Sequence, residues 1–182
     1  MKGKRDMEPT RYGIEGNAFV IRDATIGDIP DLCKLTYQQF KRENLEAIGH
    51  TFSMATSYAK YESAIQSKFF EILVAIVDCN LTGDGKLAGY YAGQYQPFPY
   101  NQNIPCLVEG GWCVDRMLEG RGIGWALIAE AEKRARANGV LHMALGTPMF
   151  EWNDKRKASY NKRGFIEAEV ICYKMLSANK QE

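Results

Sequence analysis

Residues 119–125, Glu-Gly-Arg-Gly-Ile-Gly-Trp, decide the fold of this chain, because three glycines stand where a strand-like run gives way to a helix-like one. Glycine tolerates positive φ values and lets a ligand approach the main chain closely. The first N–H groups of the following helix have no acceptor within it and lie at the positive end of its dipole. Arg121 adds a guanidinium group, which suits phosphate oxygens. The stretch therefore predicts a phosphate-binding loop, although close packing of a strand against a helix fits the same pattern.

The segments on either side of this turn indicate a strand and a helix. Residues 106–114 form an apolar run that Gly110 and Gly111 interrupt, which predicts a buried strand with a bulge. Residues 121–138 carry apolar side chains at helical spacing, and a second glycine-containing turn follows them.

Charged side chains on the helix at 121–138 form two pairs with i,i+4 spacing. These pairs are Glu130 with Arg134 and Glu132 with Arg136. Such pairs commonly stabilise an exposed helix surface, so we expect both on the solvent side.

Two common nucleotide-binding patterns are missing around the glycine turn. The strand-like run at 140–146 leads into Thr147 and not into an acidic residue that could bind a dinucleotide ribose. The turn also lacks the Gly-Lys-Ser/Thr sequence of a P-loop. A nucleotide-binding module of another fold, which would prefer ATP or NAD, is therefore disfavoured.

Two motifs at independent places resemble those of a known family. Residues 114–124 read Val-Asp-Arg-Met-Leu-Glu-Gly-Arg-Gly-Ile-Gly, and Asn153 is followed at fixed spacing by Tyr160 and by Gly164-Phe165. They resemble the pyrophosphate loop and the second signature of the GNAT family of acetyl-CoA-dependent N-acyltransferases. Residues 19–28 also look like the start of that fold, so the resemblance extends over about residues 18 to 176.

The loop departs from the family pattern at two positions. Glu119 stands where the family most often has Arg or Gln, and Arg116 stands at the usual Pro. The charge of Glu119 would repel a pyrophosphate, so we expect its side chain to turn away while Arg121 offsets the charge. The glycines, on which the geometry of the loop depends, are retained.

The resemblance implies an α/β (α+β) fold of GNAT type, with a mixed, mostly antiparallel sheet of six or seven strands. Helices are expected to flank this sheet, and its central strands to splay apart. We expect residues 1–17 to form a mobile tail and residues 18–178 a single acyltransferase domain. The sequence patterns predict strands at 19–25, 69–78, 86–94, 106–115, 140–146 and 165–176, and helices at 28–42, 56–68, 121–138 and 153–163.

The resemblance also implies where acetyl-CoA binds. In the family the pantetheine arm inserts between the splayed strands, which here places main-chain groups of Trp112, Cys113 and Val114 against it and Asn153 near its far end. The pyrophosphate is expected at the glycine loop, which comprises Gly120, Arg121, Gly122, Ile123, Gly124 and Trp125. No metal is expected, because the two histidines, His50 and His142, have no metal-ligand spacing.

The implied reaction transfers an acetyl group to a primary amine by direct attack on the thioester. A protonated amine, with a pKa of about 10.4, must first lose a proton, and the leaving thiolate needs one. The family places a proton donor at the spacing of Tyr160, whose phenol has an ordinary pKa of about 10, although this ring could simply pack a helix face. Glu109 is a candidate base, and Glu151 a second one, while a cross-strand or surface charge explains Glu109 equally well.

The acceptor amine is not fixed by the sequence. One connection between two strands is rich in aromatic, proline and asparagine residues, which are Tyr90, Tyr91, Tyr95 and residues 97–103. With the helices around residues 37 to 61, it could line an acceptor pocket, or it could contact a second copy in a homodimer. The acceptor could be a small molecule or an amine on a protein. A non-catalytic acyl-CoA sensor with the same fold is the alternative function, for which Glu119 is the strongest indication.

Composition limits the remaining possibilities. The chain has 182 residues, of which 46% are hydrophobic, and its net charge of +1 argues against a nucleic-acid partner. No apolar run reaches membrane-spanning length, and the amino-terminal residues lack the apolar core of a signal peptide. The five cysteines are scattered and odd in number, which predicts buried thiols and a cytoplasmic location.

Overall fold

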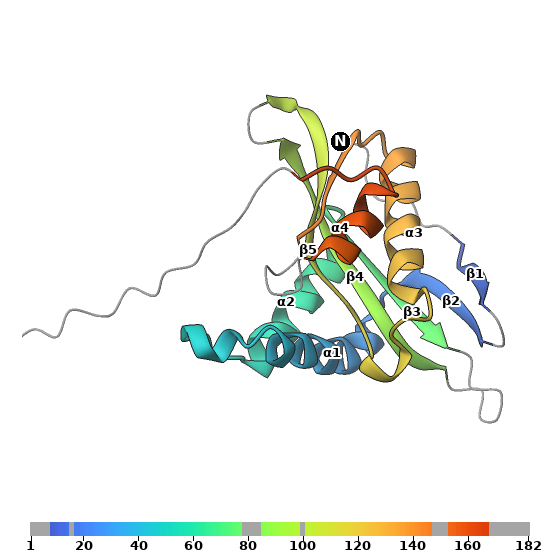
Figure 1. Ribbon diagram of the computed structural model, residues 1–182. Helices are drawn as coiled ribbons and strands as arrows, with labels where there is room; N and C mark the ends of the chain where they lie inside the picture. Colours follow the sequence, from blue (N-terminus) through green and yellow to red (C-terminus); the bar gives the residue numbers. More distant parts are fainter. Residues whose placement is uncertain (1–7, 15–16, 78–84, 99–100, 147–152, 168–182) are drawn as a thin grey trace, which may run out of the picture. The chain divides into compact units, whose positions relative to one another are not determined.

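The computed structural model describes residues 8–14, 17–77, 85–98, 101–146 and 153–167 (Figure 1). The chain divides into two compact units, which are described separately. The first comprises Met1–Gln39 and Ser53–Gly146, and the second comprises Phe40–Phe52 and Thr147–Glu182.

A sheet of six strands in chain order forms the centre of the first unit. Neighbouring strands are antiparallel except β5 and β6, which are parallel. The mixed, mostly antiparallel sheet that the sequence predicts is therefore confirmed. The strands are β1 (Thr10–Ile14), β2 (Asn17–Asp23), β3 (Phe70–Val77), β4 (Lys86–Phe98), β5 (Asn101–Val114) and β6 (His142–Ala144).

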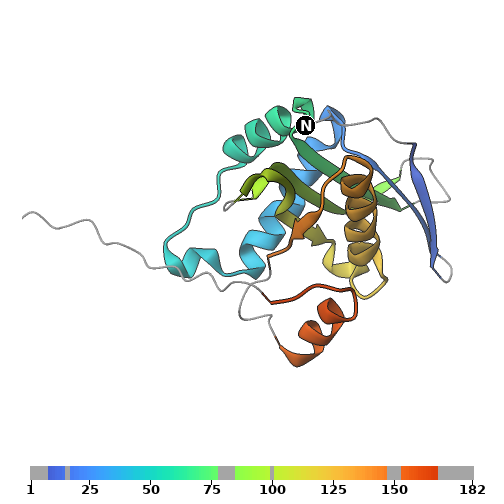
Figure 2. The same ribbon diagram turned by 90° about the horizontal axis from the view of Figure 1, so that it is seen from above.

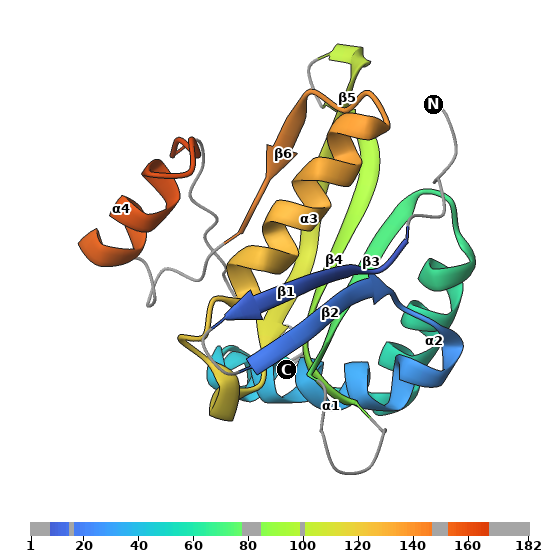
Figure 3. The same ribbon diagram turned by 90° about the vertical axis from the view of Figure 1, so that its right-hand side faces the viewer.

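Helices cover both faces of this sheet. Helices α1 (Ile29–Arg42) and α2 (Met54–Gln66) lie on one face, and α3 (Ile123–Ala137) lies on the other (Figure 2). Figure 3 shows α3 lying across β4 and β5, with β6 beside it. Strand β3 is buried on both faces, as expected for the middle of three layers.

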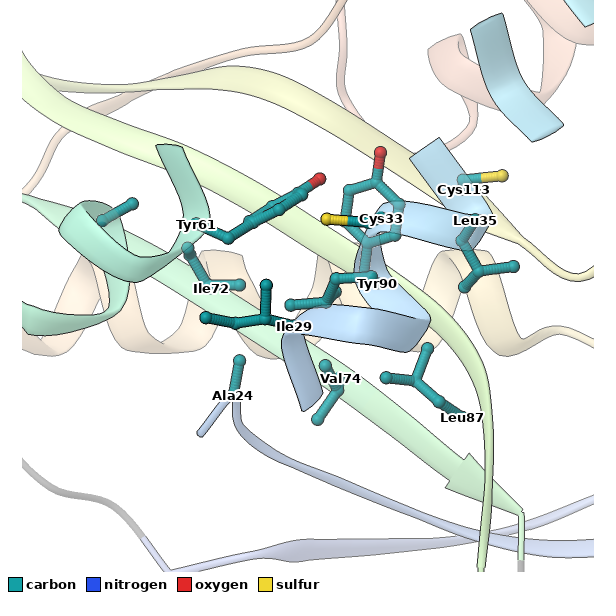
Figure 4. Packing of buried hydrophobic residues seen from close by; sticks show 12 residues of the cluster. Ala24, Ile29, Cys33, Leu35, Tyr61, Ile72, Val74, Leu87, Tyr90 and Cys113 are labelled. Atoms are coloured by element: carbon teal, nitrogen blue, oxygen red, sulfur yellow. The ribbon is translucent and has the colours of Figure 1, made fainter. Parts of the chain in front are cut away.

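The core beneath α1 and α2 is built from alternate residues of the strands. Ile72 and Val74 of β3 point to this face and pack with Ile29 and Leu32 of α1. Figure 4 shows the side chains converging from α1, α2, β3 and β4. Full burial of each large apolar side chain contributes roughly 1.5–3 kcal/mol, so this cluster fixes α1 and α2 against the sheet.

A buried ionic cluster lies on the α3 face of the sheet. Arg134 of α3 is 2% exposed and contacts Glu130 at 3.0 Å, Glu71 at 3.2 Å and Asp23 at 3.0 Å. The prediction that Glu130 and Arg134 lie on the solvent side is therefore wrong. Helical spacing alone does not show which face carries a pair, because charges that satisfy one another can be buried.

The second i,i+4 pair of α3 lies on the surface as predicted. Arg136 donates to Glu132 at 2.6 Å, and the Arg136 side chain is 75% exposed. Exposed pairs of this kind contribute little to stability, so they matter less than the buried cluster.

Strand β1 lies within the range 1–17, for which a mobile tail was expected. It pairs antiparallel with β2, and Tyr12 stacks on Phe19 with ring centroids 5.3 Å apart. The Tyr12 hydroxyl also donates to Glu130 at 3.2 Å. The tail prediction is thus wrong for Thr10–Ile14, because a buried acceptor on α3 gives this polar segment a partner.

Strands β4 and β5 are longer than the sequence indicates. They continue to Phe98 and from Asn101, so most of the connection expected at 95–103 is strand. Proline at positions 97 and 105 does not end the ladder, since both lie near the end of the hairpin. At the other end of the chain, residues 165–167 form no strand, and the rest of the strand predicted at 165–176 lies outside the described residues.

The second unit contains the end of α1, the short helix η2 (Leu45–Ile48) and helix α4 (Asp154–Asn161). Phe40 and Phe52 contact each other within it, with ring centroids 5.5 Å apart.

The cysteines bear out one prediction. Cys33, Cys106 and Cys113 are free and buried, as the sequence indicates, while Cys79 and Cys172 lie outside the described residues. In the described part of the chain, no helix is both long and apolar enough to cross a membrane.

Candidate acyl-coenzyme site

Strand β5 loses one of its two neighbours halfway along its length. Its parallel pairing with β6 covers Cys106, Leu107 and Val108 and stops there, whereas its pairing with β4 continues to Val114. The β6-facing edge of residues 109–114 therefore carries backbone groups that β6 does not pair. An edge of this kind can accept an extended chain as an additional strand, which is how the pantetheine arm is expected to bind.

A bulge at Gly110 coincides with the point of separation. Ala92 pairs with Gly111 and Gly93 pairs with Glu109, so Gly110 is the extra residue on β5. Such a bulge increases the local twist and turns the strand away from its neighbour. The glycine pair predicted to permit a bulge does so.

Glu109 bridges the gap where the two strands part. Its carboxylate Oε2 accepts a hydrogen bond of 2.9 Å from the backbone N–H of Gly146, just beyond β6. The side chain is half-buried and belongs to the α3 face of the sheet. A carboxylate thus lies at the end of the pairing between β5 and β6.

The glycine loop adopts the backbone that only glycine adopts readily. Gly120 and Gly122 both have φ of 77°, and a Cβ atom at Gly120 would meet nothing within 4 Å. Gly122 is the N-cap of α3 and has no side chain to cap the first turn, while Ala126 N–H makes the first helical bond to its carbonyl. The first N–H groups of α3 therefore have no acceptor within the helix, and exposed Arg121 lies between the two glycines that precede it.

Gly124 differs from the other two glycines of the loop. A Cβ atom there would lie 2.6 Å from Cζ3 of Trp112 and 3.4 Å from Cγ2 of Val114. Its small size allows α3 to start directly against β5, so the packing interpretation holds at this position. The Trp112 ring also contacts Trp125, with centroids 6.0 Å apart.

Asp115 fixes the chain between β5 and the loop. Its carboxylate accepts hydrogen bonds from Lys86 Nζ at 2.8 Å and from Met117 N–H at 2.9 Å, and it caps the short helix η3 (Arg116–Leu118). The hydrogen bond from Lys86, together with that from Met117, lowers the pKa of Asp115 below its usual value. The entry into the loop is thereby held by a charged group that stays ionised.

The predicted cofactor residues of the first unit lie together. Gly124 lies against Trp112 and Val114, and the Trp112 ring contacts Trp125. The adjacent turn is formed by Gly120, Arg121, Gly122 and Ile123. Cys113 lies on the opposite face, in the core beneath α1 and α2 (Figure 4). The Cys113 thiol therefore lies away from the glycine loop and Trp112. Only the main chain of Cys113 can make the contact predicted with the pantetheine arm.

Asn153 and Tyr160 belong to the second unit. Asn153 is the N-cap of α4, where its side-chain oxygen accepts from the N–H of Arg156 at 3.0 Å. Tyr160 is 5% exposed and meets Phe165 edge to face, with centroids 5.7 Å apart. The capping role of Asn153 was missed, although Asn before a helical segment is a known signal for it. Glu151 lies outside the described residues.

Tyr91, which the sequence analysis placed in the aromatic connection that could line an acceptor pocket, lies close to Glu109 in the sheet. It lies on β4, beside the pairing of Gly93 with Glu109. A glycine inside a strand often marks a close approach by another group, and here that group is the Tyr91 ring.

The acetyltransferase (GNAT) family model matches residues 37–165 of the chain. No curated protein sequence matches it significantly. Among solved structures, a tetramutant of the BH1408 protein from Bacillus halodurans has a TM-score of 0.69 at 21% identity, covering 86% of this chain and 99% of that chain.

Two further solved structures are similar. The aminoglycoside N-acetyltransferase AAC(6')-Iy, in complex with CoA, has a TM-score of 0.67 at 19% identity, with 90% of this chain and 97% of that chain covered. A predicted acetyltransferase from Clostridium acetobutylicum, solved with acetyl-CoA, has a TM-score of 0.66 at 14% identity, with 86% and 96% covered. At these identities the structures show a common fold. The family match extends over well more than half of the sequence, and the chain belongs to the acetyltransferase (GNAT) family.

Proposed function

We propose that this protein is an acetyl-CoA-dependent N-acetyltransferase that acetylates a primary amine. The observation that carries the proposal is the end of the pairing between β5 and β6 at Val108, on the strand that leads into the glycine loop before α3. Family membership supports acetyl transfer, and two similar solved proteins contain CoA or acetyl-CoA.

The described residues fit an acyl-coenzyme in two ways. The β6-facing edge of β5 from Glu109 to Val114, which β6 itself does not pair, offers main-chain groups to an extended pantetheine arm. The loop at Gly120–Gly122 has positive φ at both glycines and a helix start behind it, which suits a pyrophosphate. Arg121 would add a charge-assisted contact.

The thioester supplies an activated acetyl group, and the side chains of Glu109 and Tyr160 would accept and donate the protons. Glu109 would take the proton that the ammonium group must lose before nitrogen can attack the carbonyl carbon. Tyr160 would give a proton to the sulfur as the carbon–sulfur bond breaks, and its phenolate would take the second proton that the nitrogen loses as the amide forms. Asn153 would contact the far end of the pantetheine arm.

The acceptor is proposed to be a primary amine, on a small molecule or on a protein. Two of the similar solved structures are described as aminoglycoside acetyltransferases, so aminoglycosides belong among the first amines to test. A cytoplasmic location and a homodimer stay predictions from the sequence.

Thiol release from acetyl-CoA, measured over a panel of aminoglycosides, polyamines, amino acids and peptides, tests the proposal. We expect release with at least one amine, and a fall in kcat of about 10²–10⁴-fold in Glu109→Gln, because a general base contributes that much. Acetyl-CoA binding without release from any amine would favour a sensor instead. Unchanged kcat in Glu109→Gln would remove Glu109 from the mechanism.

A further inference from the structure

Tyr91 of β4 buries a hydroxyl group without a hydrogen-bond partner. The residue is 0% exposed, and its hydroxyl oxygen has no partner among the described residues. Burial of an unpartnered hydroxyl is unfavourable, and such groups are rare in folded proteins. A group of this kind next to an active site therefore calls for an explanation in terms of function.

The Tyr91 ring lies across the next residue on its own face of the strand. A Cβ atom at Gly93 would be 2.6 Å from the Tyr91 hydroxyl oxygen and 2.9 Å from Cε1. The same position is only 2.8 Å from Cδ1 of Leu107. The phenol thus occupies the place that a side chain at position 93 would take.

That place is directly opposite Glu109. Gly93 and Glu109 are partners across β4 and β5, and the Cβ atoms of such partners lie about 4.5–5.5 Å apart. The Tyr91 ring occupies the position of a side chain at residue 93, so it is the cross-strand neighbour of the Glu109 side chain. Burial, and then the charge of Glu109, raise the pKa of Tyr91 well above its ordinary value. The phenol therefore keeps its proton at neutral pH and can act as a donor.

The other titratable groups near Tyr91 are Tyr95 on the same strand, Glu71 on β3 and Cys106 on β5. Tyr95 donates to Glu71 at 2.8 Å, so its proton is already engaged. Glu71 in turn accepts from Arg134 of α3. Tyr95, Glu71 and Arg134 thus bond to one another, whereas the Tyr91 hydroxyl has no partner in the described part of the chain.

The Glu109 carboxylate can accept hydrogen bonds from several donors at once. Its Oε2 accepts the hydrogen bond from Gly146, while an ionised carboxylate offers about four acceptor positions on its two oxygens. A donor from β4 would lie on the other side of the carboxylate from Gly146, which follows β6. The two donors together would fix the orientation of the Glu109 side chain.

We propose that Tyr91 is a positioning residue whose hydroxyl donates a hydrogen bond to the Glu109 carboxylate during acetyl transfer. The hydroxyl favours the ionised form of Glu109 and orients it toward the edge of β5 that β6 does not pair. This inference rests on the proposed function, in which Glu109 takes the proton of the amine.

The variant Tyr91→Phe removes only the hydroxyl. We expect kcat to fall about tenfold, which corresponds to one hydrogen bond to a charged group, with an unchanged Kd for acetyl-CoA. The acidic limb of the kcat/KM profile should move to higher pH, because loss of the donor raises the pKa of Glu109. The melting temperature should stay constant or rise, since an unpartnered hydroxyl is lost. A large fall in melting temperature would show a structural role and overturn the proposal.

A second readout does not depend on turnover. The pKa of the Glu109 carboxyl can be followed by carbon-13 NMR in the wild-type chain and in Tyr91→Phe, both free and with saturating CoA. A higher pKa of Glu109 in Tyr91→Phe than in the wild type supports the proposal. Equal pKa values in the two proteins, both free and with CoA, overturn it. If the proposed function itself were wrong, the wild-type chain would release no thiol with any amine. That result is distinguishable from a failure of the Tyr91 proposal.

Tyr95→Phe is the matched control, because Tyr95 is another buried phenol on the same strand and face. Its hydroxyl is bonded to Glu71 and accepts from Asn138, so its loss should lower stability. The pKa of Glu109 should stay unchanged in this variant. A shift as large as that in Tyr91→Phe would mean that any lost phenol acts in this way, which contradicts a specific role for Tyr91.

Discussion

Gly124→Ala tests whether α3 begins at its observed place because glycine makes room for Trp112. The new methyl carbon would lie 2.6 Å from Cζ3 and 3.4 Å from Cε3 of that ring, whereas carbon atoms in contact prefer about 3.5–4.0 Å. Overpacking costs about 1–3 kcal/mol, while alanine in a helix gains about 1 kcal/mol over glycine. We therefore expect a net loss of about 1 kcal/mol, seen as a fall of about 2–4 °C in melting temperature.

The same substitution should weaken coenzyme binding, because the displaced helix start carries the N–H groups of the loop. We expect the Kd for CoA, measured by calorimetry, to rise about fivefold, or close to 1 kcal/mol. Trp112→Leu provides the control, since it removes the obstructing ring atoms. In that background Gly124→Ala should be neutral or stabilising. An equal loss of stability in both backgrounds would refute the steric explanation.

Three further changes address other parts of the structure. Arg134→Met leaves Glu71 buried without its cation and Glu130 with Lys133 as its cation, so the free energy of unfolding in urea should fall by about 3–5 kcal/mol; a loss below 1 kcal/mol would contradict the buried cluster. Tyr160→Phe should lower turnover with little change in Kd for acetyl-CoA, and unchanged turnover would exclude it as the proton donor. Asp115 has a lowered pKa in the folded chain, so its stabilising effect is present above its unfolded value of about 3.9 and is lost as the pH falls through the folded value. The stability difference between wild type and Asp115→Asn should accordingly be constant near neutral pH and shrink below about pH 4, whereas a constant difference at all pH values would argue against this ionisation.

Local backbone chemistry made much of the site predictable. Gly120 and Gly122 need positive φ, and Gly110 permits a bulge, so each position is recognisable from the residue type and its place in the sequence. The same holds for the strand before the loop and the helix after it. Such features depend on neighbours within a few residues.

The incorrect predictions concern contacts between distant residues. The ion pair of Glu130 and Arg134 is buried because Glu71 and Asp23 come from other strands, and helical spacing carries no information about them. Tyr12 orders β1 through an acceptor 118 residues away. Tyr91 lies near Glu109 only because β4 pairs with β5, and the sequence does not give the register of that pairing.

The most direct test of the central claim is a calorimetric titration of the purified chain with acetyl-CoA, with ATP and NAD as controls under the same conditions. We predict one saturable site for acetyl-CoA and no comparable binding of ATP or NAD, because the loop at Gly120–Gly122 and the edge of β5 that β6 does not pair together fit pyrophosphate and pantetheine. Absence of acetyl-CoA binding, or equal affinity for ATP, would contradict the proposed acyl-coenzyme site.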